Sequence, residues 1–374
     1  MDKQGKLGNR HIVIMAGGTG GHIFPALAIA EKAQEEGAGI SWLGTRYGLE
    51  TKLVSGDYPL DYLSVSGVRK KGGLRKLMLP FSLTKAILQA MIILKKRKAD
   101  LVIGFGGYVS GPGGIAAKLL GIPLMIHEQN ARAGLTNKVL AKLARKVLCA
   151  FPANSFAGWE KSAIVGNPVR REICDLHDRS HDFYKKYLNV LVLGGSQGAK
   201  ALNEIIPCVL SALSETVQVN LWHQTGQNSH REVLALYRQH GLMPNQETGK
   251  QGLKVVAFIE EMASAYHWAD VVVCRSGALT VSELAVAGLP AFFVPFPYAV
   301  DNHQYYNAQF LVKAGAAVCV EQKDLSVKKL AGFIKKMHVD RAGLSAMSEK
   351  AKSTAFLQAT EAVMKYIKRE FDGW

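Results

Sequence analysis

The sequence lacks the features that define several large protein classes. Its five cysteines are scattered, odd in number and never spaced as Cys-x-x-Cys: Cys149, Cys174, Cys208, Cys274 and Cys319. This pattern disfavours a disulfide framework or a structural zinc site, and it indicates reduced thiols in a cytosolic protein. No apolar run reaches the roughly 18 residues that a membrane-spanning helix needs, and the polar first ten residues do not fit a signal peptide. We therefore expect a soluble or peripheral protein.

Common nucleotide-binding and metal-binding motifs are also missing. The glycine-rich loops GGTGGH (17–22) and GGSQGA (194–199) both lack the Gly-x-Gly-x-x-Gly spacing of dinucleotide-binding loops, and no P-loop sequence occurs. No Asp-x-Asp pair is present, although many sugar-nucleotide transferases bind Mg²⁺ or Mn²⁺ through one. We therefore expect no metal and no cofactor. A departing diphosphate would be neutralised by helix N-termini, hydroxyls and arginine instead.

Positive charge is abundant and unevenly distributed. The net charge is +16, and residues 1–175 carry 25 Lys and Arg against 12 Asp and Glu. Between Asp61 and Asp100 there are ten basic residues and no acidic one. Such asymmetry indicates that the first half faces a polyanion, either nucleic acid or anionic lipid. The alternative is a solvated basic face without a partner.

The order of apolar runs and glycine loops predicts an α/β protein. An apolar run, a glycine loop and a helical pattern occur in that order near Gly17 and again near Gly194, 177 residues later. Further short apolar runs alternate with helical segments in both halves, which favours parallel sheets. We expect two doubly wound Rossmann-like lobes, 1–167 and 168–374, facing across a cleft lined by the glycine loops. The amphipathic segment 356–371 should form a last helix, which we expect to pack back on the N-terminal lobe.

Polar residues that follow the predicted strands are candidates for binding and catalysis. His22 closes the first glycine loop, where an imidazole could take a proton from a hydroxyl, although a lone histidine is more often structural. The HEQN segment (127–130) suits a hydroxyl-rich ligand, or its asparagine caps a helix. In RSGALTVSEL (275–284), Thr280 and backbone N–H groups at a helix start would stabilise a diphosphate, and Glu283 could bind two ribose hydroxyls. The alternative is an ordinary capped helix with a glutamate in its first turn.

These motifs resemble, as an ordered set, the MurG family of bacterial cell-wall glycosyltransferases. The matching segments are GGTGGHIFPALA, GFGGYVSGP, HEQNARAGLTNK, VGNPVR, GGSQGA, RSGALTVSELAVAGLP and DNHQYYNA, which span residues 17–308. The resemblance implies the GT-B fold. It implies transfer of N-acetylglucosamine from UDP-GlcNAc to the C4 hydroxyl of muramoyl-pentapeptide on a diphospho-undecaprenol carrier. The α-linked donor becomes a β-linked product, so the implied reaction is inverting.

The resemblance also assigns roles to individual residues. The residues near the donor sugar and the site of transfer are Thr19, Gly20, Gly21 and Asn130. The nucleotide is assigned to Arg170, Ser196 and Ile259, the diphosphate to Ala278, Leu279 and Thr280, the ribose to Glu283 and the sugar to Gln304. His22 is the leading candidate for the catalytic base, and Glu128 is the alternative. His303 stands where some relatives have glutamine, which leaves its contact with the sugar open.

A membrane partner follows from the same resemblance. It makes 1–167 the acceptor-binding and membrane-associating lobe and 168–374 the UDP-sugar lobe, at the cytoplasmic face of the bacterial inner membrane. The segment 68–98 mixes Lys and Arg with large apolar residues, which suits an anionic lipid surface. Alternatively, the apolar residues of this segment face the core: Leu77, Leu79, Phe81 and Ile87. Proteins of cell-wall synthesis are expected partners by analogy.

Two other functions remain open at this stage. A UDP-GlcNAc 2-epimerase would use the same uridine pocket without a membrane surface. A nucleic-acid-binding protein would explain the basic half. However, Phe81 is the one aromatic residue of segment 68–98, whereas proteins that bind single-stranded nucleic acid usually stack its bases on several aromatic side chains. We therefore expect no nucleic-acid partner.

Overall fold

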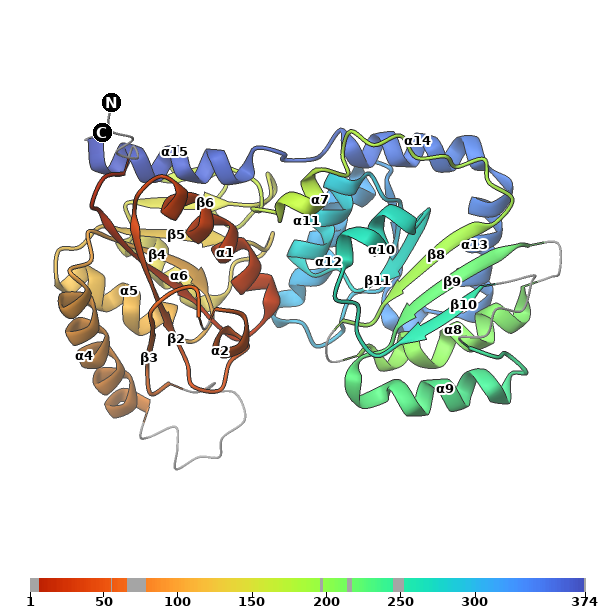
Figure 1. Cartoon of the computed structure of the whole chain (residues 1–374), viewed down its shortest axis with the longest axis horizontal. Coiled ribbons are helices and arrows are strands. Elements are labelled where there is room, and N and C mark those ends of the chain that lie inside the picture. Colours follow the sequence, from red (N-terminus) through yellow and green to blue (C-terminus); the bar gives the residue numbers. More distant parts are fainter. Residues whose placement is uncertain are drawn as a thin grey trace. The chain divides into compact units, whose positions relative to one another are not determined.

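The computed structural model describes residues 7–54, 56–65, 79–195, 198–213, 217–244 and 252–372. The chain divides into two compact units (Figure 1). Unit 1 contains Met1–Arg170 together with Phe356–Trp374, and unit 2 contains Arg171–Ala355. Each unit is an α/β domain built on one parallel sheet, which confirms the expected fold class.

The described part of unit 1 forms a seven-stranded sheet in the order β3-β2-β1-β4-β5-β6-β7. Its strands are β1 (His11–Ala16), β2 (Gly39–Gly44), β3 (Leu60–Tyr62), β4 (Leu101–Gly106), β5 (Leu124–Glu128), β6 (Lys146–Cys149) and β7 (Ser162–Ile164). The strands β3 and β7 lie at the two edges of this sheet, and each contains a polar residue and no buried one, so no apolar run marks them in the sequence.

Helices cover both faces of this sheet because alternate residues of β1 point to opposite sides. Ile12 and Ile14 share a buried cluster with residues of α1 (Gly20–Glu35) and α15 (Ala359–Asp372). Val13 and Met15 share another with residues of α4 (Leu79–Arg97), α5 (Ser110–Leu119) and α6 (Leu135–Leu143). The helix α1 begins five residues before Pro25, which lies inside it, so the glycine loop leads directly into the helix.

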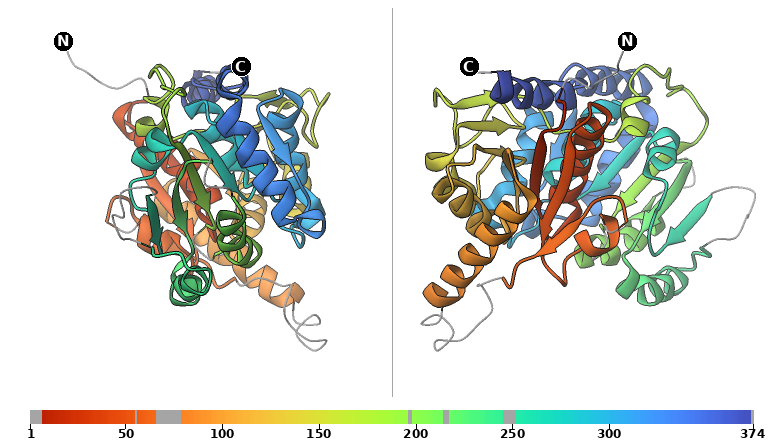
Figure 2. Two further views of the ribbon diagram at one scale, coloured as in Figure 1. Left: turned by 90° about the vertical axis from the view of Figure 1, so that its right-hand side faces the viewer. Right: turned by 60° about the vertical axis from the view of Figure 1, so that its left-hand side comes forward.

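The last helix, α15, belongs to unit 1 although the whole of unit 2 precedes it in the chain. It lies beside α1, as Figures 1 and 2 both show. Lys368 places its Nζ 2.7 Å from a carboxylate oxygen of Glu36, and Arg145 pairs with Glu370. Val363 and Ile367 are buried against the sheet. Apolar burial therefore holds this helix in place, with ion pairs at its margins.

The described part of unit 2 forms a six-stranded sheet in the order β10-β9-β8-β11-β12-β13. Its strands are β8 (Leu188–Leu193), β9 (Val219–Gln224), β10 (Leu253–Val256), β11 (Val271–Cys274), β12 (Ala291–Phe293) and β13 (Ala317–Cys319). The helices used below are α7 (Arg171–Cys174), α8 (Lys200–Ala212), α9 (His230–Gln239), α10 (Met262–Trp268), α11 (Ala278–Ala287), α12 (His303–Lys313), α13 (Val327–Val339) and α14 (Arg341–Lys352). Val190 and Val192 of β8 pack with Leu202 of α8 and Leu330 of α13.

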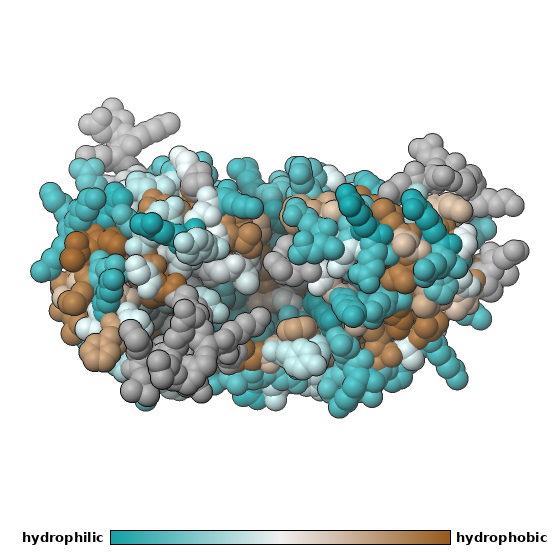
Figure 3. Space-filling view, turned by 90° about the horizontal axis from the view of Figure 1, so that it is seen from below, coloured by the Kyte–Doolittle hydropathy of each residue, from teal (hydrophilic) through white to brown (hydrophobic). Residues whose placement is uncertain are grey.

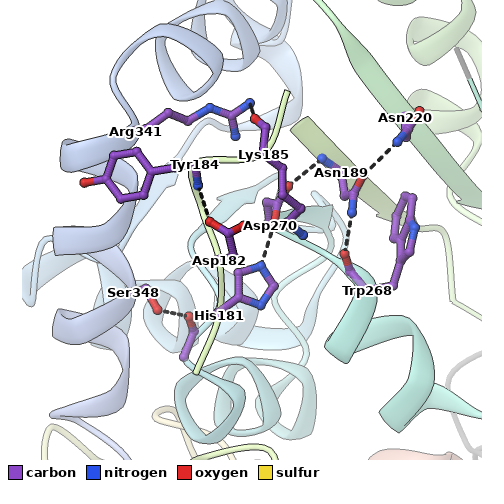
Figure 4. A network of polar contacts seen from close by, with 11 residues as sticks. His181, Asp182, Tyr184, Lys185, Asn189, Asn220, Trp268, Asp270, Arg341 and Ser348 are labelled. Atoms are coloured by element: carbon purple, nitrogen blue, oxygen red, sulfur yellow. Dashed lines mark hydrogen bonds and ion pairs between the residues drawn. The ribbon is translucent and has the colours of Figure 1, made fainter. Parts of the chain in front are cut away.

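The segment between α7 and β8 is fastened to unit 2 by a buried carboxylate (Figure 4). Asp270 is fully buried and accepts a hydrogen bond of 2.8 Å from the backbone N–H of Asn189. Nε2 of His181 lies 2.6 Å from its other oxygen, and Nζ of Lys185 lies 3.1 Å from that oxygen. This polar, charged segment is therefore packed against unit 2 at the amino ends of β8 and β11.

None of the helices in the described ranges has the length and apolar character that crossing a bilayer requires.

Candidate functional site

The two sheets place their glycine loops at equivalent positions. In each sheet the first strand in sequence is central, and the chain order reverses beside it, between β1 and β4 and between β8 and β11. Ligands of open parallel sheets bind beyond the carboxyl ends of the strands at this point. The first loop follows β1 and the second follows β8. Each unit therefore has a candidate site at the carboxyl edge of its sheet.

The first glycine loop is packed against a buried carboxylate, Glu50. One oxygen of Glu50 accepts hydrogen bonds from the backbone N–H of Thr45 (2.7 Å) and its hydroxyl (2.8 Å), and the other accepts one from the N–H of Gly18 (3.1 Å). A Cβ on Gly17 would lie 2.9 Å from Oε1 of Glu50, and one on Gly107 would lie 2.5 Å from the carbonyl oxygen of Gly17. The loop therefore needs glycine for close packing. Sequence reasoning missed Glu50, whose partner in the loop lies 32 residues away.

His22 lies in the first turn of α1, between two segments that follow other strands. Its Nδ1 is 3.2 Å from the side-chain oxygen of Gln129, just beyond β5. A Cβ on Gly106 would lie 2.9 Å from the His22 ring, so the end of β4 also packs closely against the imidazole. His22 is half-buried and Gln129 is buried. The amide, which sequence reasoning did not single out, therefore contacts the candidate base directly.

Glu128 is enclosed by hydrogen-bond donors. Its Oε1 accepts from the backbone N–H (2.9 Å) and the amide (3.1 Å) of Asn130, and its Oε2 accepts from the amide of Asn137 (2.9 Å). The side chain is 2% exposed. Burial raises the pKa of Glu128, and the hydrogen bonds from Asn130 and Asn137 oppose that rise. The carboxylate thus holds the segment that follows β5 in shape.

Its neighbour His127 is buried between strand and backbone. The ring stacks on Phe105, with centroids 5.4 Å apart, and its Nε2 lies 3.0 Å from the carbonyl oxygen of Gly166. Burial lowers the pKa of His127 to about 4, against the opposing effect of the hydrogen bond to Gly166. This histidine is therefore neutral at pH 7.

The remaining predicted residues of unit 1 lie around the same edge. Thr19 is exposed and precedes α1, while Gly20 and Gly21 are its first two residues. The guanidinium of Arg170 lies 4.7 Å from the ring centroid of Phe24, one turn further along α1. Arg170 therefore packs on the helix that carries the first glycine loop.

In unit 2, close backbone contacts again explain the glycine loop. A Cβ on Gly194 would lie 2.8 Å from the carbonyl oxygen of Gln224, and one on Gly198 would lie 2.6 Å from that of Thr225. Ser196, the predicted nucleotide contact in this loop, lies outside the described residues. The side-chain oxygen of Gln224 accepts a hydrogen bond of 3.1 Å from the N–H of Ile259, another predicted contact. Ile259 is thereby held at the carboxyl edge of the sheet.

The helix α11 begins at the predicted diphosphate-binding residues. Gly277 precedes it in an extended conformation, and Ala278, Leu279 and Thr280 are its first three residues. The first N–H groups of a helix have no intrahelical acceptor, and the helix dipole makes this end positive. Glu283 is 5% exposed and accepts a hydrogen bond of 2.9 Å from the hydroxyl of Tyr266. An anion and a hydroxyl-rich group could bind side by side here.

A second cluster of contacts holds Gln304 close to α11. Its side-chain oxygen accepts a hydrogen bond of 2.9 Å from the N–H of Phe296, and its carbonyl oxygen accepts one of 2.8 Å from the hydroxyl of Ser276. Nδ1 of His303 lies 2.9 Å from the carbonyl oxygen of Val300, a contact inside the same loop.

Arg275 is a further residue that sequence reasoning did not assign. Its guanidinium donates to the carbonyl oxygens of Val294 and Pro295 and to the side chain of Gln322. These bonds tie the loop after β12 to the end of β11. Among the described residues, no group of three or more His, Cys, Asp or Glu side chains is placed to hold a metal ion.

The helix α4 presents a mixed apolar and basic outer surface, which we call the α4 face. It consists of Phe81, Leu83, Lys85, Leu88, Ile92, Lys95 and Lys96, all exposed. Phe81 and Ile92 are 77% and 68% exposed, too much for core residues. Ile87, in contrast, packs against the core, while Leu77 and the side chain of Leu79 lie outside the description. On the left of Figure 3, hydrophobic residues lie among hydrophilic ones over the part of unit 1 that carries α4.

Comparison with known proteins identifies relatives along nearly the whole chain. The model of the glycosyltransferase family 28 N-terminal domain matches residues 12–149, and that of the C-terminal domain matches residues 189–363. A protein of Shewanella baltica (strain OS185) is 47% identical over 355 residues, which cover 95% of this chain and 96% of that protein. A protein of Shewanella sp. (strain W3-18-1) is 47% identical over 364 residues, 97% of each chain. Both are named UDP-N-acetylglucosamine–N-acetylmuramyl-(pentapeptide) pyrophosphoryl-undecaprenol N-acetylglucosamine transferase.

Solved structures of similar proteins also match nearly the whole chain. The crystal structure of Acinetobacter baumannii MurG matches with a TM-score of 0.79 and 40% identity, and the match covers 96% of this chain and 99% of that one. A UDP-N-acetylglucosamine 2-epimerase structure matches with a TM-score of 0.66 at 13% identity, covering 97% of this chain and 96% of that one. The second likeness concerns the fold alone.

Proposed function

This chain belongs to glycosyltransferase family 28, and we propose that it transfers N-acetylglucosamine from UDP-GlcNAc to lipid-linked muramoyl-pentapeptide, forming the lipid-linked disaccharide precursor of peptidoglycan. The observation that carries this proposal is the 47% identity to transferases of that name over 95% of the chain. The aligned residues extend over both units, so the similarity is not confined to one of the two domains. The epimerase alternative has support from the fold alone.

We assign the donor to unit 2. The N-terminus of α11 offers the N–H groups of Ala278, Leu279 and Thr280 to the diphosphate, and its positive end stabilises the negative charge. Glu283, one turn further, accepts hydrogen bonds from the ribose hydroxyls. The side-chain oxygen of Gln304 accepts a hydrogen bond from the N–H of Phe296, so we assign the amide N–H groups of Gln304 to the sugar. Ser196, Ile259 and Arg170 stay predictions from the resemblance.

We assign the acceptor hydroxyl to His22. With the Gln129 oxygen as acceptor, Nδ1 of His22 carries the proton and the ring lone pair is on Nε2. Nε2 would take the proton of the C4 hydroxyl while its oxygen attacks C1 of the donor sugar. Glu128 is the weaker candidate because its carboxylate already accepts three hydrogen bonds. Thr19, Gly20, Gly21 and Asn130 stay predicted neighbours of the reacting groups.

The proposed reaction requires no reactant other than the donor and the acceptor. The C4 oxygen forms a bond to C1 from the face opposite the diphosphate, and the bond from C1 to the UDP oxygen breaks. UDP leaves with the bonding electron pair, and its new charge is stabilised at the start of α11. The hydroxyl proton goes to His22. Attack from the opposite face inverts the configuration at C1.

We assign the α4 face to an anionic membrane surface. Phe81, Lys85, Leu88 and Ile92 follow the three-and-four-residue spacing that places them on one side of the helix. Apolar side chains flanked by lysines suit the boundary between headgroups and acyl chains. The acceptor is itself a membrane lipid, so this surface would bring the enzyme to its substrate as a peripheral protein at the cytoplasmic face.

Incubation with labelled UDP-GlcNAc and the lipid-linked muramoyl-pentapeptide, with and without EDTA, tests the proposed function. We expect a labelled lipid-linked disaccharide and substantial activity in EDTA. Release of UDP or N-acetylmannosamine without the acceptor would identify an epimerase instead. Activity that disappears in EDTA and returns only with Mn²⁺ or Mg²⁺ would reveal a metal site.

A further inference from the structure

A buried hydrogen bond links two helices beside the nucleotide-binding edge of unit 2. The hydroxyl of Tyr266, on α10, donates to Oε2 of Glu283, on α11, at 2.9 Å. The two side chains are 2% and 5% exposed. Glu283 is the residue that we assign to the ribose, whereas Tyr266 belongs to none of the glycine-loop or helix-start motifs.

The position of this pair points to a role in ligand binding. Glu283 lies in the second turn of α11, the helix that follows the carboxyl end of β11, where parallel sheets bind nucleotides. A carboxylate this deeply buried needs hydrogen-bond donors to remain stable, and Tyr266 supplies one.

The hydrogen bond also restricts the orientation of the carboxylate. The last torsion of a glutamate side chain has broad energy wells, so an unanchored carboxylate samples many planes. Two adjacent ribose hydroxyls bind well only when both carboxylate oxygens lie in a suitable plane. Because Tyr266 anchors Oε2 from a buried ring, it fixes that plane before the nucleotide arrives, which lowers the ordering cost of binding.

We propose that Tyr266 is a positioning residue that orients Glu283 toward the ribose diol and thereby sets the preference for uridine over 2′-deoxyuridine nucleotides. This inference rests on the proposed contact between Glu283 and the ribose. It assigns the specificity for ribose to a pair of residues on two helices, of which Glu283 alone touches the substrate.

The test compares the affinities of UDP and 2′-deoxy-UDP, measured by calorimetry without an acceptor. The variants are Tyr266→Phe, Glu283→Ala and the matched control Tyr237→Phe. Tyr237 is also buried in unit 2, and its hydroxyl lies 2.8 Å from Nδ1 of His223. The control therefore loses the same atom from a buried polar contact that has no proposed role in binding.

We expect the ratio of the two affinities to fall by about three- to tenfold in Tyr266→Phe, the range typical of one net hydrogen bond. The affinity for 2′-deoxy-UDP should change little, and Tyr237→Phe should keep the wild-type ratio. Equal weakening of both ligands in Tyr266→Phe, or an unchanged ratio, would overturn the inference.

The Glu283→Ala variant distinguishes the positioning role of Tyr266 from the ribose contact of Glu283. A reduced ratio in Glu283→Ala with an unchanged ratio in Tyr266→Phe rejects the positioning role alone. An unchanged ratio in Glu283→Ala rejects the ribose contact itself, and the inference about Tyr266 with it. Circular dichroism of each variant confirms that unit 2 remains folded.

Discussion

Nδ1 of His22 lies 3.2 Å from the side-chain oxygen of Gln129, although the two residues are 107 positions apart in the sequence. The contact joins the first turn of α1 to the residue that follows β5. The buried amide thereby selects the tautomer of the candidate catalytic base, because an amide oxygen accepts a hydrogen bond only from a ring nitrogen that carries a proton.

Loss of His22 should slow turnover far more than donor binding. General-base loss typically costs about 10²–10⁴-fold in rate, so His22→Ala should lower kcat by that order and leave the affinity for UDP nearly unchanged. Gln129→Leu should lower kcat less, because the imidazole remains but its tautomer is no longer selected. Steady-state kinetics and UDP titration measure both effects. A kcat loss below about threefold in His22→Ala, far under the usual range for a base, would make Glu128 the better candidate.

Stability should fall at mildly acidic pH through His127. The pKa of this buried imidazole is lowered to about 4, whereas in the unfolded chain it lies near 6.5. Between pH 6.5 and pH 4 this histidine is therefore protonated in the unfolded chain but neutral in the folded chain. The free energy of unfolding decreases as the pH falls through this range. The loss from this one group is about 2 kcal/mol at pH 5.

The variant His127→Gln tests this dependence because glutamine does not titrate and can still donate to the Gly166 carbonyl. Hydrogen exchange of the β5 amides at pH 7 and pH 5 measures the local stability of unit 1. We expect a smaller difference between the two pH values in the variant than in the wild type. Identical differences would show that His127 does not carry the effect.

Asp270 should be essential to the stability of unit 2. Its removal takes a hydrogen-bond partner from His181, the ion-pair partner from Lys185 and the acceptor from the buried N–H of Asn189. Leaving a buried donor without its acceptor typically costs about 1–3 kcal/mol, so Asp270→Ala should destabilise unit 2 by at least that amount. Hydrogen exchange of β8 and β11 reports this change, and exposed Asp324→Ala serves as the control. A loss no larger than that of the control would contradict the structural role.

Membrane binding should depend on the α4 face. Each lysine near an anionic surface contributes about 1 kcal/mol, so the triple variant Lys85→Gln, Lys95→Gln, Lys96→Gln should weaken binding to phosphatidylglycerol vesicles by roughly 100-fold. Activity on the full-length lipid acceptor should fall with it, whereas activity on a short-chain, water-soluble acceptor should persist.

The matched control removes three lysines from unit 2, at Lys328, Lys329 and Lys335 on α13, all exposed. It should leave vesicle binding largely unchanged. A second variant, with Phe81, Leu88 and Ile92 replaced by serine, tests the apolar contribution separately. If vesicle binding is the same in both triple lysine variants, charge on the α4 face is not what brings the protein to the membrane.

Much of the fold could be predicted because it depends on local pattern. The apolar run before Gly17 and the one before Gly194 correspond to β1 and β8, and the run before Arg275 corresponds to β11. Each is followed by a short loop that contains glycine and then by a helix, as the sequence order indicates. The edge strands β3 and β7 escaped notice because each contains a polar residue and no buried one, whereas the equally short β12 is apolar and fully buried.

The candidate site also contains some residues that local sequence patterns predict and others that only the fold reveals. The sequence by itself determined the two-sheet architecture, the glycine loops, the family and the candidates His22 and Glu283, because these depend on contiguous residues and their spacing. Only the tertiary structure decided that Glu50 holds the first loop, that Gln129 contacts His22 and that Tyr266 anchors Glu283. The order of strands in each sheet brings these partners together from distant positions, and that order is set by the burial of whole faces, which no local pattern encodes.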